Sequence, residues 1–316
     1  MEESAWAEFW AVGDSEQAVG GKHRDRLAGI WRDFFTALAP PVPLILDIAA
    51  GNGAAINVGW KTFSATDAAT PLLIATDYSV AAVAGSLNGR NGVLGFASDA
   101  ARLPIRDQSV SVAISQFGIE YAGLGAFEDA ARILAPGGYF LSISHYTGGA
   151  IDAECAENAR LLRAVDETGV QEAARRALAS SYERRRRGDE TPIDEAIESR
   201  LQTAFSNAAQ TVREAPQSAA QQTLARFLGD LSTLITRRLA YQETDALGWV
   251  DGMASSLAAY GKRMNSMRDS ALGADAIKRI ETSFVAARLV DFSAEPLTLD
   301  PERPPAAWII RARRSP

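Results

Sequence analysis

A short apolar run that ends in a glycine-rich turn constrains the fold of this chain more than any other feature. The run Leu44–Ile48 contains one polar residue, Asp47, and is followed by the turn Ala49-Ala-Gly-Asn-Gly53. Glycine has no side chain, so it lets the backbone turn tightly and approach a ligand closely. A buried strand that leads through such a turn into a helix is typical of doubly wound folds that bind nucleotide-like ligands.

Further apolar runs alternate with helical stretches along the first half of the chain. Strands are predicted at 72–76, 93–97, 110–115 and 139–144, and helices at 79–87 and 127–134. The Pro136-Gly-Gly138 segment is expected to stop the second helix and lead into the next strand. Apolar runs at 289–299 and 307–312 predict a final antiparallel pair. The predicted fold class is therefore α/β, with a doubly wound, seven-stranded and mostly parallel sheet.

Two segments without strand signals flank or interrupt this sheet. Residues 1–40 are rich in aromatic residues and predict a helical cap, which would either fold over a ligand or cover the sheet. Residues 148–284 predict a large helical insertion, expected to shape the ligand pocket or to build a homodimer interface. Residues 41–147 then form the core, and 285–316 complete its sheet. The clearest helical periodicity in the insertion lies at Leu224, Phe227, Leu228, Leu231, Leu234, Ile235 and Leu239.

Composition excludes several classes of protein. The formal net charge of −7 and the pI near 5.1 argue against a surface that broadly binds nucleic acid. No apolar run approaches the roughly 20 residues that span a bilayer, so no membrane segment is expected. The single cysteine, Cys155, excludes an intrachain disulfide and a cysteine-based metal cluster, and no metal site is expected. We therefore expect a cytoplasmic protein.

Two acidic residues, Asp77 and Asp99, follow the second and third predicted strands. Ligands of open parallel sheets bind beyond the carboxyl ends of the strands, where these residues would lie. Asp77 could accept both hydroxyls of a ribose, and Asp99 could accept a hydrogen bond from an adenine amino group. This edge of the sheet is therefore expected to bind a nucleoside.

Five segments in a fixed order resemble the class I S-adenosylmethionine-dependent methyltransferases. They are 47–53, 75–78, 98–109, 112–118 and 132–138. The resemblance implies a Rossmann-like core with S-adenosylmethionine as the cofactor. The cofactor-binding residues that it implies are Asp47, Ala49, Gly51, Gly53, Asp77, Tyr78, Asp99, Ala100, Ser115 and Gln116.

Each matching position has an implied contact. The backbone at Gly51 and Gly53 would pass close to the methionine part of the cofactor, and Asp77 would bind its ribose. Ala49 stands where the family usually has its first glycine. Tyr78 would pack near the adenosine.

At the other strand ends, the resemblance implies that Asp99 meets the adenine amino group and that Ala100 supplies a backbone contact. Ser115 and Gln116 would line the floor near the sulfonium.

A dinucleotide cofactor fits the sequence less well, because Ile56 occupies the third glycine position of the Gly-x-Gly-x-x-Gly motif. The function that the sequence favours is methyl transfer to an oxygen, nitrogen or carbon of a small-molecule acceptor. Two alternatives stay open: a non-catalytic regulatory or structural protein that binds S-adenosylmethionine, and a protein or tRNA methyltransferase.

Three residues are candidates for catalysis. His145 directly follows the fifth predicted strand, which places it on the ligand-binding edge as a general base or substrate contact. Glu120 and Tyr121 follow the fourth strand, in a loop that often faces the substrate in the family that the chain resembles. A loop histidine bonded to backbone, an exposed glutamate and a packing tyrosine are the structural alternatives.

Overall fold

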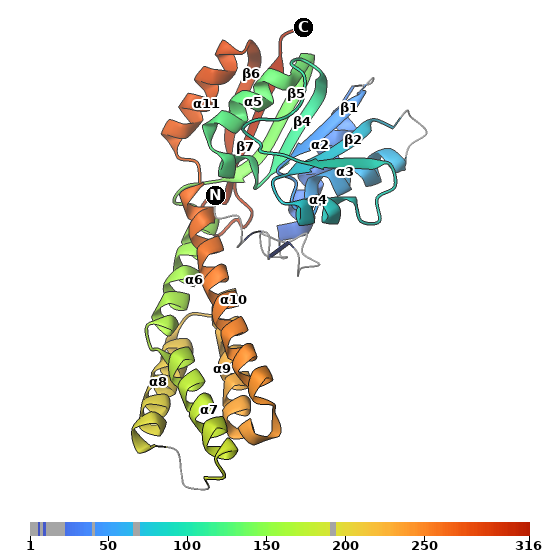
Figure 1. The fold of residues 1–316 in the computed structure, drawn as a ribbon. Helices are drawn as coiled ribbons and strands as arrows, with labels where there is room; N and C mark the ends of the chain where they lie inside the picture. Colours follow the sequence, from blue (N-terminus) through green and yellow to red (C-terminus); the bar gives the residue numbers. More distant parts are fainter. Residues whose placement is uncertain (1–5, 7–8, 11–22, 40–41, 66–69, 190–193) are drawn as a thin grey trace. The chain divides into compact units, whose positions relative to one another are not determined.

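The computed structural model describes all residues except 1–5, 7–8, 11–22, 40–41, 66–69 and 190–193. The chain divides into two compact units. Residues 1–153 and 266–316 hold the sheet, and residues 154–265 are helical (Figure 1). The chain passes from one unit to the other within two helices, α6 (Ala150–Asp166) and α10 (Glu243–Asp269).

The sheet unit has the predicted seven-stranded α/β architecture. Its strand order is β3-β2-β1-β4-β5-β7-β6, with β1 to β5 parallel and β7 antiparallel to both of its neighbours. The chain runs outward from β1 to β3 and then returns to place β4 beside β1. Ligands bind at such a switch in strand order. The strands are β1 (Leu44–Ile48), β2 (Leu72–Asp77), β3 (Val93–Ala97), β4 (Val110–Gln116), β5 (Leu134–His145), β6 (Leu289–Leu297) and β7 (Ala307–Arg314).

One strand boundary differs clearly from its prediction. The sequence places Pro136-Gly-Gly138 before the fifth strand, whereas β5 begins at Leu134 and contains this segment. The pairing of β4 with β5 shifts register between Val110 and Val112, so the segment forms an irregularity within the ladder. A Cβ atom on Gly138 would lie 2.9 Å from the Ser111 carbonyl oxygen, which explains the need for glycine at this crossing.

Helices cover both faces of the sheet. On one face, α5 (Leu124–Ile133) and α11 (Ala274–Ala286) belong to an apolar cluster that also contains Leu46 and Ile48 of β1, and the Phe140 and Phe284 rings lie 5.2 Å apart. Side chains alternate along a strand, so Asp47 of β1 points to the other face of the sheet. There it accepts a hydrogen bond from the first turn of α3 (Ala54–Ser64). Two more helices, α2 (Arg24–Ala37) and α4 (Val80–Leu87), belong to this second layer.

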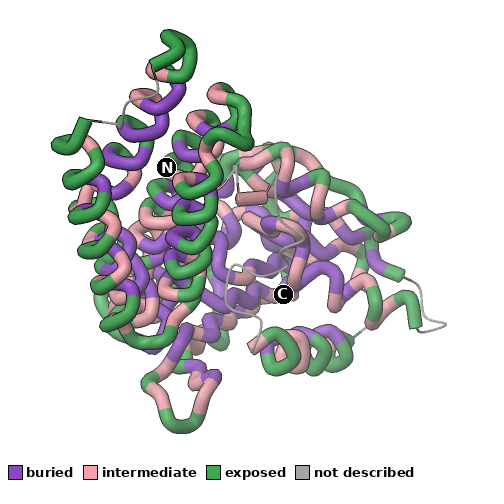
Figure 2. Tube along the Cα trace, turned by 90° about the horizontal axis from the view of Figure 1, so that it is seen from below, coloured by how far each residue is buried: buried purple, intermediate pink, exposed green. Residues whose placement is uncertain are grey.

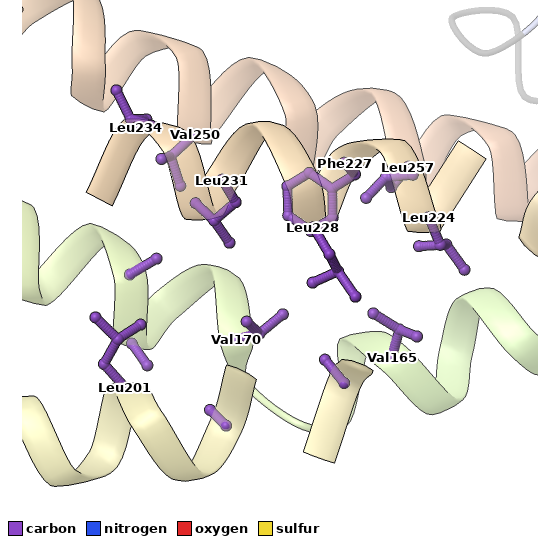
Figure 3. Packing of buried hydrophobic residues seen from close by; sticks show 14 of the residues in the cluster. Val165, Val170, Leu201, Leu224, Phe227, Leu228, Leu231, Leu234, Val250 and Leu257 are labelled. Carbon is purple, nitrogen blue, oxygen red and sulfur yellow. The ribbon is translucent and has the colours of Figure 1, made fainter. Parts of the chain in front are cut away.

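The helical unit has its own apolar core (Figure 3). Its helices are most of α6 and α10 together with α7 (Val170–Arg186), α8 (Glu195–Glu214) and α9 (Ala219–Thr236). Phe227, Leu228 and Leu231 point from α9 into this core, as the periodicity predicts. Leu239 is an exception: it lies beyond the end of α9 and is 59% exposed.

The helical unit is shorter than the predicted insertion. The compact unit spans 154–265, whereas the prediction was 148–284. The difference arises chiefly because α11 packs on α5 and β6 as a covering helix of the sheet. Buried and exposed positions alternate along the helices of the protein (Figure 2). None of the helices in the described residues combines the length and apolarity needed to cross a membrane.

Candidate functional site

The glycine loop after β1 has an unusual backbone. Ala49, Gly51 and Gly53 all have positive φ angles, of 53°, 54° and 82°. Glycine adopts this conformation without strain, whereas alanine does so rarely. Ala49 therefore holds a backbone conformation that suits glycine, the residue usual at this position in the family that the chain resembles. The Ala50 N–H donates to the Thr76 carbonyl oxygen at 2.9 Å, which fixes the loop to the end of β2.

The loop is in close contact on two sides. A Cβ atom on Gly51 would lie 2.7 Å from Cζ2 of Trp10, so this indole rests directly on the loop backbone. A Cβ atom on Gly118 would lie 2.3 Å from the carbonyl oxygen of Ala49. Gly118, which follows β4, was not predicted as a site residue. Its requirement arises from a tertiary contact that the sequence does not reveal.

Asp47 connects β1 to the helix that follows the glycine loop. Its side chain is 1% exposed, and Oδ2 accepts the backbone N–H of Ile56 at 3.1 Å. Oδ1 is buried with no hydrogen-bond partner among the described residues. Burial raises the pKa of this carboxyl from 3.8 to about 8. Asp47 does not line the cavity described below, so its direct role is to join the first turn of α3 to β1.

Asp77 lies at the carboxyl end of β2 and lines the cavity. Its Oδ2 accepts the Gly51 N–H and its Oδ1 accepts the Ser79 N–H, each at 2.9 Å. Burial raises the pKa of this carboxyl, while these two backbone donors lower it. Two fixed donors hold the side chain in one orientation and leave each oxygen a lone pair for a ligand. Tyr78 beside it is half-exposed and also lines the cavity.

Of the two residues predicted to bind the cofactor after β3, Ala100 lines the cavity and Asp99 does not. Ala100 and Ser98 line the cavity, and the Ser98 hydroxyl lies 2.8 Å from that of Thr76. Asp99 is exposed and is not a lining residue; its Oδ1 accepts the Ala101 N–H at 2.9 Å. The carboxyl of Asp99 therefore stabilises its own turn.

At the end of β4, Ser115 and Gln116 are in different environments. Ser115 is fully buried, donates to the Ile48 carbonyl oxygen at 2.7 Å and accepts the Ile119 N–H at 3.0 Å. It joins β1 to the loop after β4 and does not line the cavity. Gln116 does line it, and its Oε1 accepts the indole N–H of Trp31 at 2.5 Å.

The three catalytic candidates lie together. Oε1 of Glu120 lies 2.7 Å from Nδ1 of His145 and also accepts the backbone N–H of His145 at 2.9 Å. Both side chains are buried, and His145 Nε2 has no hydrogen-bond partner in the described part of the chain. Neither residue lines the cavity, although Phe117 and Tyr121 do, with ring centroids 4.7 and 5.8 Å from the imidazole. The rings of Phe117 and Tyr121 therefore separate His145 from the cavity.

The cavity measures about 880 Å³ and extends from the glycine loop to the inner side of α2. Aromatic residues form much of its wall. Trp6 and Trp10 stack at 6.0 Å, and the Trp6 ring meets Tyr121 edge to face at 5.4 Å. Part of the aromatic N-terminal segment thus belongs to the site, while residues 11–22 lie outside the described residues. Lining residues that were not predicted as site residues include Leu27, Ala28, Trp31, Asn57, Lys61 and Phe117.

Comparison with known proteins identifies one domain. Residues 46–142 match a family model described as a methyltransferase domain. No curated protein sequence matches the chain. Each of the following solved structures is similar at low identity.

A chain of the complex between the Haloferax volcanii Trm112 methyltransferase activator and a methyltransferase is 22% identical, with a TM-score of 0.31. The match covers 40% of this chain and 52% of that one. An S-adenosylmethionine-dependent methyltransferase from Thermotoga maritima is 20% identical, with a TM-score of 0.30, over 39% and 54% of the two chains. The YcgJ protein from Bacillus subtilis is 15% identical, with a TM-score of 0.38, over 92% and 99%. This chain spans about half the length of the first two.

Proposed function

We propose that this chain, which carries a class I methyltransferase domain at residues 46–142, transfers the methyl group of S-adenosylmethionine to a small-molecule acceptor. The observation that carries the proposal is a single cavity of about 880 Å³ that reaches both the glycine loop and the aromatic walls. Pockets for small ligands measure roughly 300–1,000 Å³. The cavity therefore has room for a nucleoside cofactor and a small acceptor together.

The end of the cavity near β2 suits the nucleoside. Both oxygens of Asp77 are oriented by backbone donors and could accept the two ribose hydroxyls. Tyr78 and Ala100 supply surface beside them. Gly51 has no side chain of its own, but the Trp10 indole lies against its backbone, so the methionine part would reach this backbone only if Trp10 moves. These features support cofactor binding through Asp77, and they give Asp99 no direct part in it.

The opposite end suits an acceptor with apolar surface. Trp6 and Phe117 form walls there, with Tyr121 edge-on to Trp6. S-adenosylmethionine, when bound, supplies a methyl group already activated on its sulfonium. The chain would then have to hold the acceptor in line with that methyl and exclude water, which large aromatic walls favour.

The buried pair Glu120 and His145 supports a role in orientation. The Glu120 carboxylate lies 2.7 Å from Nδ1 of His145 and so fixes the orientation of the imidazole. The imidazole contacts the Phe117 and Tyr121 rings, which line the cavity. We propose that Tyr121 contacts the acceptor and that His145, held by Glu120, positions Tyr121. Direct proton abstraction by His145 would require Phe117 or Tyr121 to move.

Methyl transfer can be tested without knowing the acceptor. The full chain is incubated with S-adenosylmethionine carrying a radiolabelled methyl and with separate pools of carboxylic acids, phenols, amines, tRNA and cell protein. We expect transfer in a small-molecule pool. In parallel, S-adenosylhomocysteine should raise the melting temperature, because a ligand that binds only the folded state stabilises it.

The two measurements separate the alternatives. Stabilisation by S-adenosylhomocysteine without transfer to any pool would favour a non-catalytic binding protein. Transfer only to tRNA or protein would replace the small-molecule acceptor with a macromolecule. Absence of both stabilisation and transfer would contradict the proposed function.

A further inference from the structure

Trp31 reaches the candidate site from α2, outside the matched methyltransferase domain. It is fully buried, and its indole N–H donates to Oε1 of Gln116 at 2.5 Å. Neighbouring rings hold the indole, since Trp31 stacks on Phe35 at 6.0 Å and meets Phe34 edge to face at 6.1 Å. The backbone of Gln116 is fixed by the pairing of β4 with Ile143 of β5. Both partners of this hydrogen bond are therefore held rigidly.

This contact determines which way the Gln116 amide faces. An indole nitrogen donates a hydrogen bond and never accepts one, so the amide oxygen must face Trp31. The amide NH₂ group then points away from Trp31. Gln116 lines the cavity, and none of the described protein groups accepts a hydrogen bond from its nitrogen. Gln116 thus has two N–H donors without a partner among the described residues, on a side chain that borders the cavity.

We propose that Trp31 is a positioning residue that fixes Gln116 as a hydrogen-bond donor toward the cavity, where the amide binds an oxygen atom of a ligand. The inference rests on the proposed function and adds a chemical class to it. A carboxylate, carbonyl or phenolic oxygen fits this donor, whereas an ammonium group has no lone pair to accept its hydrogen bond. The oxygen belongs either to the carboxylate of the cofactor or to the acceptor.

The charges around the cavity agree with an oxygen ligand. The basic residues Arg24, Arg32 and Lys61 line it, together with the acidic residues Asp25 and Asp77. Each oxygen of the Asp77 carboxyl accepts one backbone N–H, and these lining residues comprise three basic and two acidic side chains. The lining therefore does not exclude an anionic ligand.

Two substitutions test the proposal. Gln116→Glu keeps an oxygen for the Trp31 N–H but replaces the amide donors with a second acceptor. Trp31→Phe keeps most of the ring but removes the N–H, so the amide becomes free to reverse. Trp60→Phe is the matched control, because it also loses an indole hydrogen bond, to the Asn91 carbonyl oxygen, but does not line the cavity.

Two probes identify the source of the oxygen. S-adenosylhomocysteine has the amino-acid carboxylate, and 5′-methylthioadenosine lacks it. If Gln116 binds the cofactor carboxylate, we expect Gln116→Glu to weaken S-adenosylhomocysteine at least tenfold in calorimetry and methylthioadenosine less than twofold. If Gln116 binds the acceptor, both affinities stay within twofold and kcat/KM for an oxygen-bearing acceptor falls at least tenfold. Trp31→Phe should give a smaller loss with the same selectivity, and Trp60→Phe none.

The positioning contact is also measurable without any ligand. In ¹H–¹⁵N spectra, the indole resonance of Trp31 should move in Gln116→Leu and stay close to its original position in Gln116→Glu. Equal loss of both nucleosides, or no change with any probe or acceptor, would overturn the donor role. If the chemical shift of the Trp31 indole N–H is unchanged in Gln116→Leu, the positioning role is wrong. If wild-type protein binds no adenosyl compound, the proposed function fails, whereas this spectrum still decides whether Trp31 holds Gln116.

Discussion

One carboxylate oxygen of Glu120 accepts two hydrogen bonds from His145, one from the backbone N–H at 2.9 Å and one from Nδ1 at 2.7 Å. Both side chains are buried, so neither donor has water as a substitute. The pair fixes the loop after β4 to the end of β5. Tyr121 follows Glu120 in the sequence, contacts the His145 ring and lines the cavity, which is why we propose that the pair positions it.

Removing the Glu120 acceptor should destabilise the sheet unit. An unsatisfied buried donor costs about 1–3 kcal/mol, and Glu120→Ala leaves two. We therefore expect Glu120→Ala to lower the free energy of unfolding by roughly 2–6 kcal/mol in urea titrations. Glu120→Gln keeps an acceptor oxygen and should lose clearly less. Equal losses in the two variants would show that the hydrogen bonds do not matter.

The buried carboxyl of Asp47 should make stability depend on pH. Its pKa is about 8 in the folded protein, against 3.8 for an exposed carboxyl, so the folded state binds the extra proton between these values. Its contribution is therefore most favourable below about pH 4 and is lost as pH rises toward 8. The slope is at most about 1.4 kcal/mol per pH unit. Asp47→Asn should flatten the curve of unfolding free energy against pH across this range. A curve parallel to that of the wild type would contradict the assignment.

The two acidic strand ends should differ in cofactor binding. Asp77 lines the cavity, whereas Asp99 is exposed and does not. We expect Asp77→Ala to weaken S-adenosylhomocysteine at least tenfold in calorimetry and Asp99→Ala less than threefold. If both variants lose a similar amount of affinity, Asp99 contacts the cofactor as the sequence predicts.

Gly118→Ala tests the close approach of two loops. Gly118 has a negative φ of −142°, so alanine is not strained by the backbone itself. Its Cβ atom would, however, lie 2.3 Å from the Ala49 carbonyl oxygen. Overpacking of this kind typically costs about 1–3 kcal/mol, and it should also weaken S-adenosylhomocysteine. Gly229→Ala, in an open position on α9, is the control and should stabilise by about 0.5–1 kcal/mol.

The helical unit allows a matched pair of leucine variants. Leu231 is fully buried in the core of the unit, and Leu239 is mostly exposed. Leu231→Ala should cost about 2–5 kcal/mol and Leu239→Ala no more than about 0.5 kcal/mol. Urea unfolding followed by circular dichroism measures both. A large loss for Leu239→Ala would mean that this residue is buried in the protein in solution.

Two strands were predicted with the correct bounds from the local sequence pattern. Leu44–Ile48 and Val93–Ala97 have the predicted bounds, because apolar runs flanked by turn residues leave little choice of register. At Pro136-Gly-Gly138 the local signal indicated a break, but pairing with β4 extends the strand through it. Pairing with a neighbouring strand thus overrode a local preference.

Side-chain contacts across the site were harder to predict. A strand end reveals that Ser115 and Asp99 are near the ligand edge, but it does not reveal whether their oxygens are already engaged by backbone. The roles of Trp31 and Gly118 were not predicted. Trp31 donates a hydrogen bond to a distant strand end, and Gly118 lies against a carbonyl 69 positions earlier in the chain. Such contacts depend on tertiary packing, which the local sequence pattern does not specify.

The order of strands at one edge of the sheet also affects how the protein is made. β6 pairs only with β7, and β7 alone joins it to β5. During synthesis, residues 289–297 therefore have no strand partner until residues 307–314 have left the ribosome. The helical unit lies entirely upstream and is built from contacts within 154–265, so it can fold while the sheet is still open. The unit that contains the cavity is synthesised first in part, but its sheet is completed only after the helical unit has been synthesised.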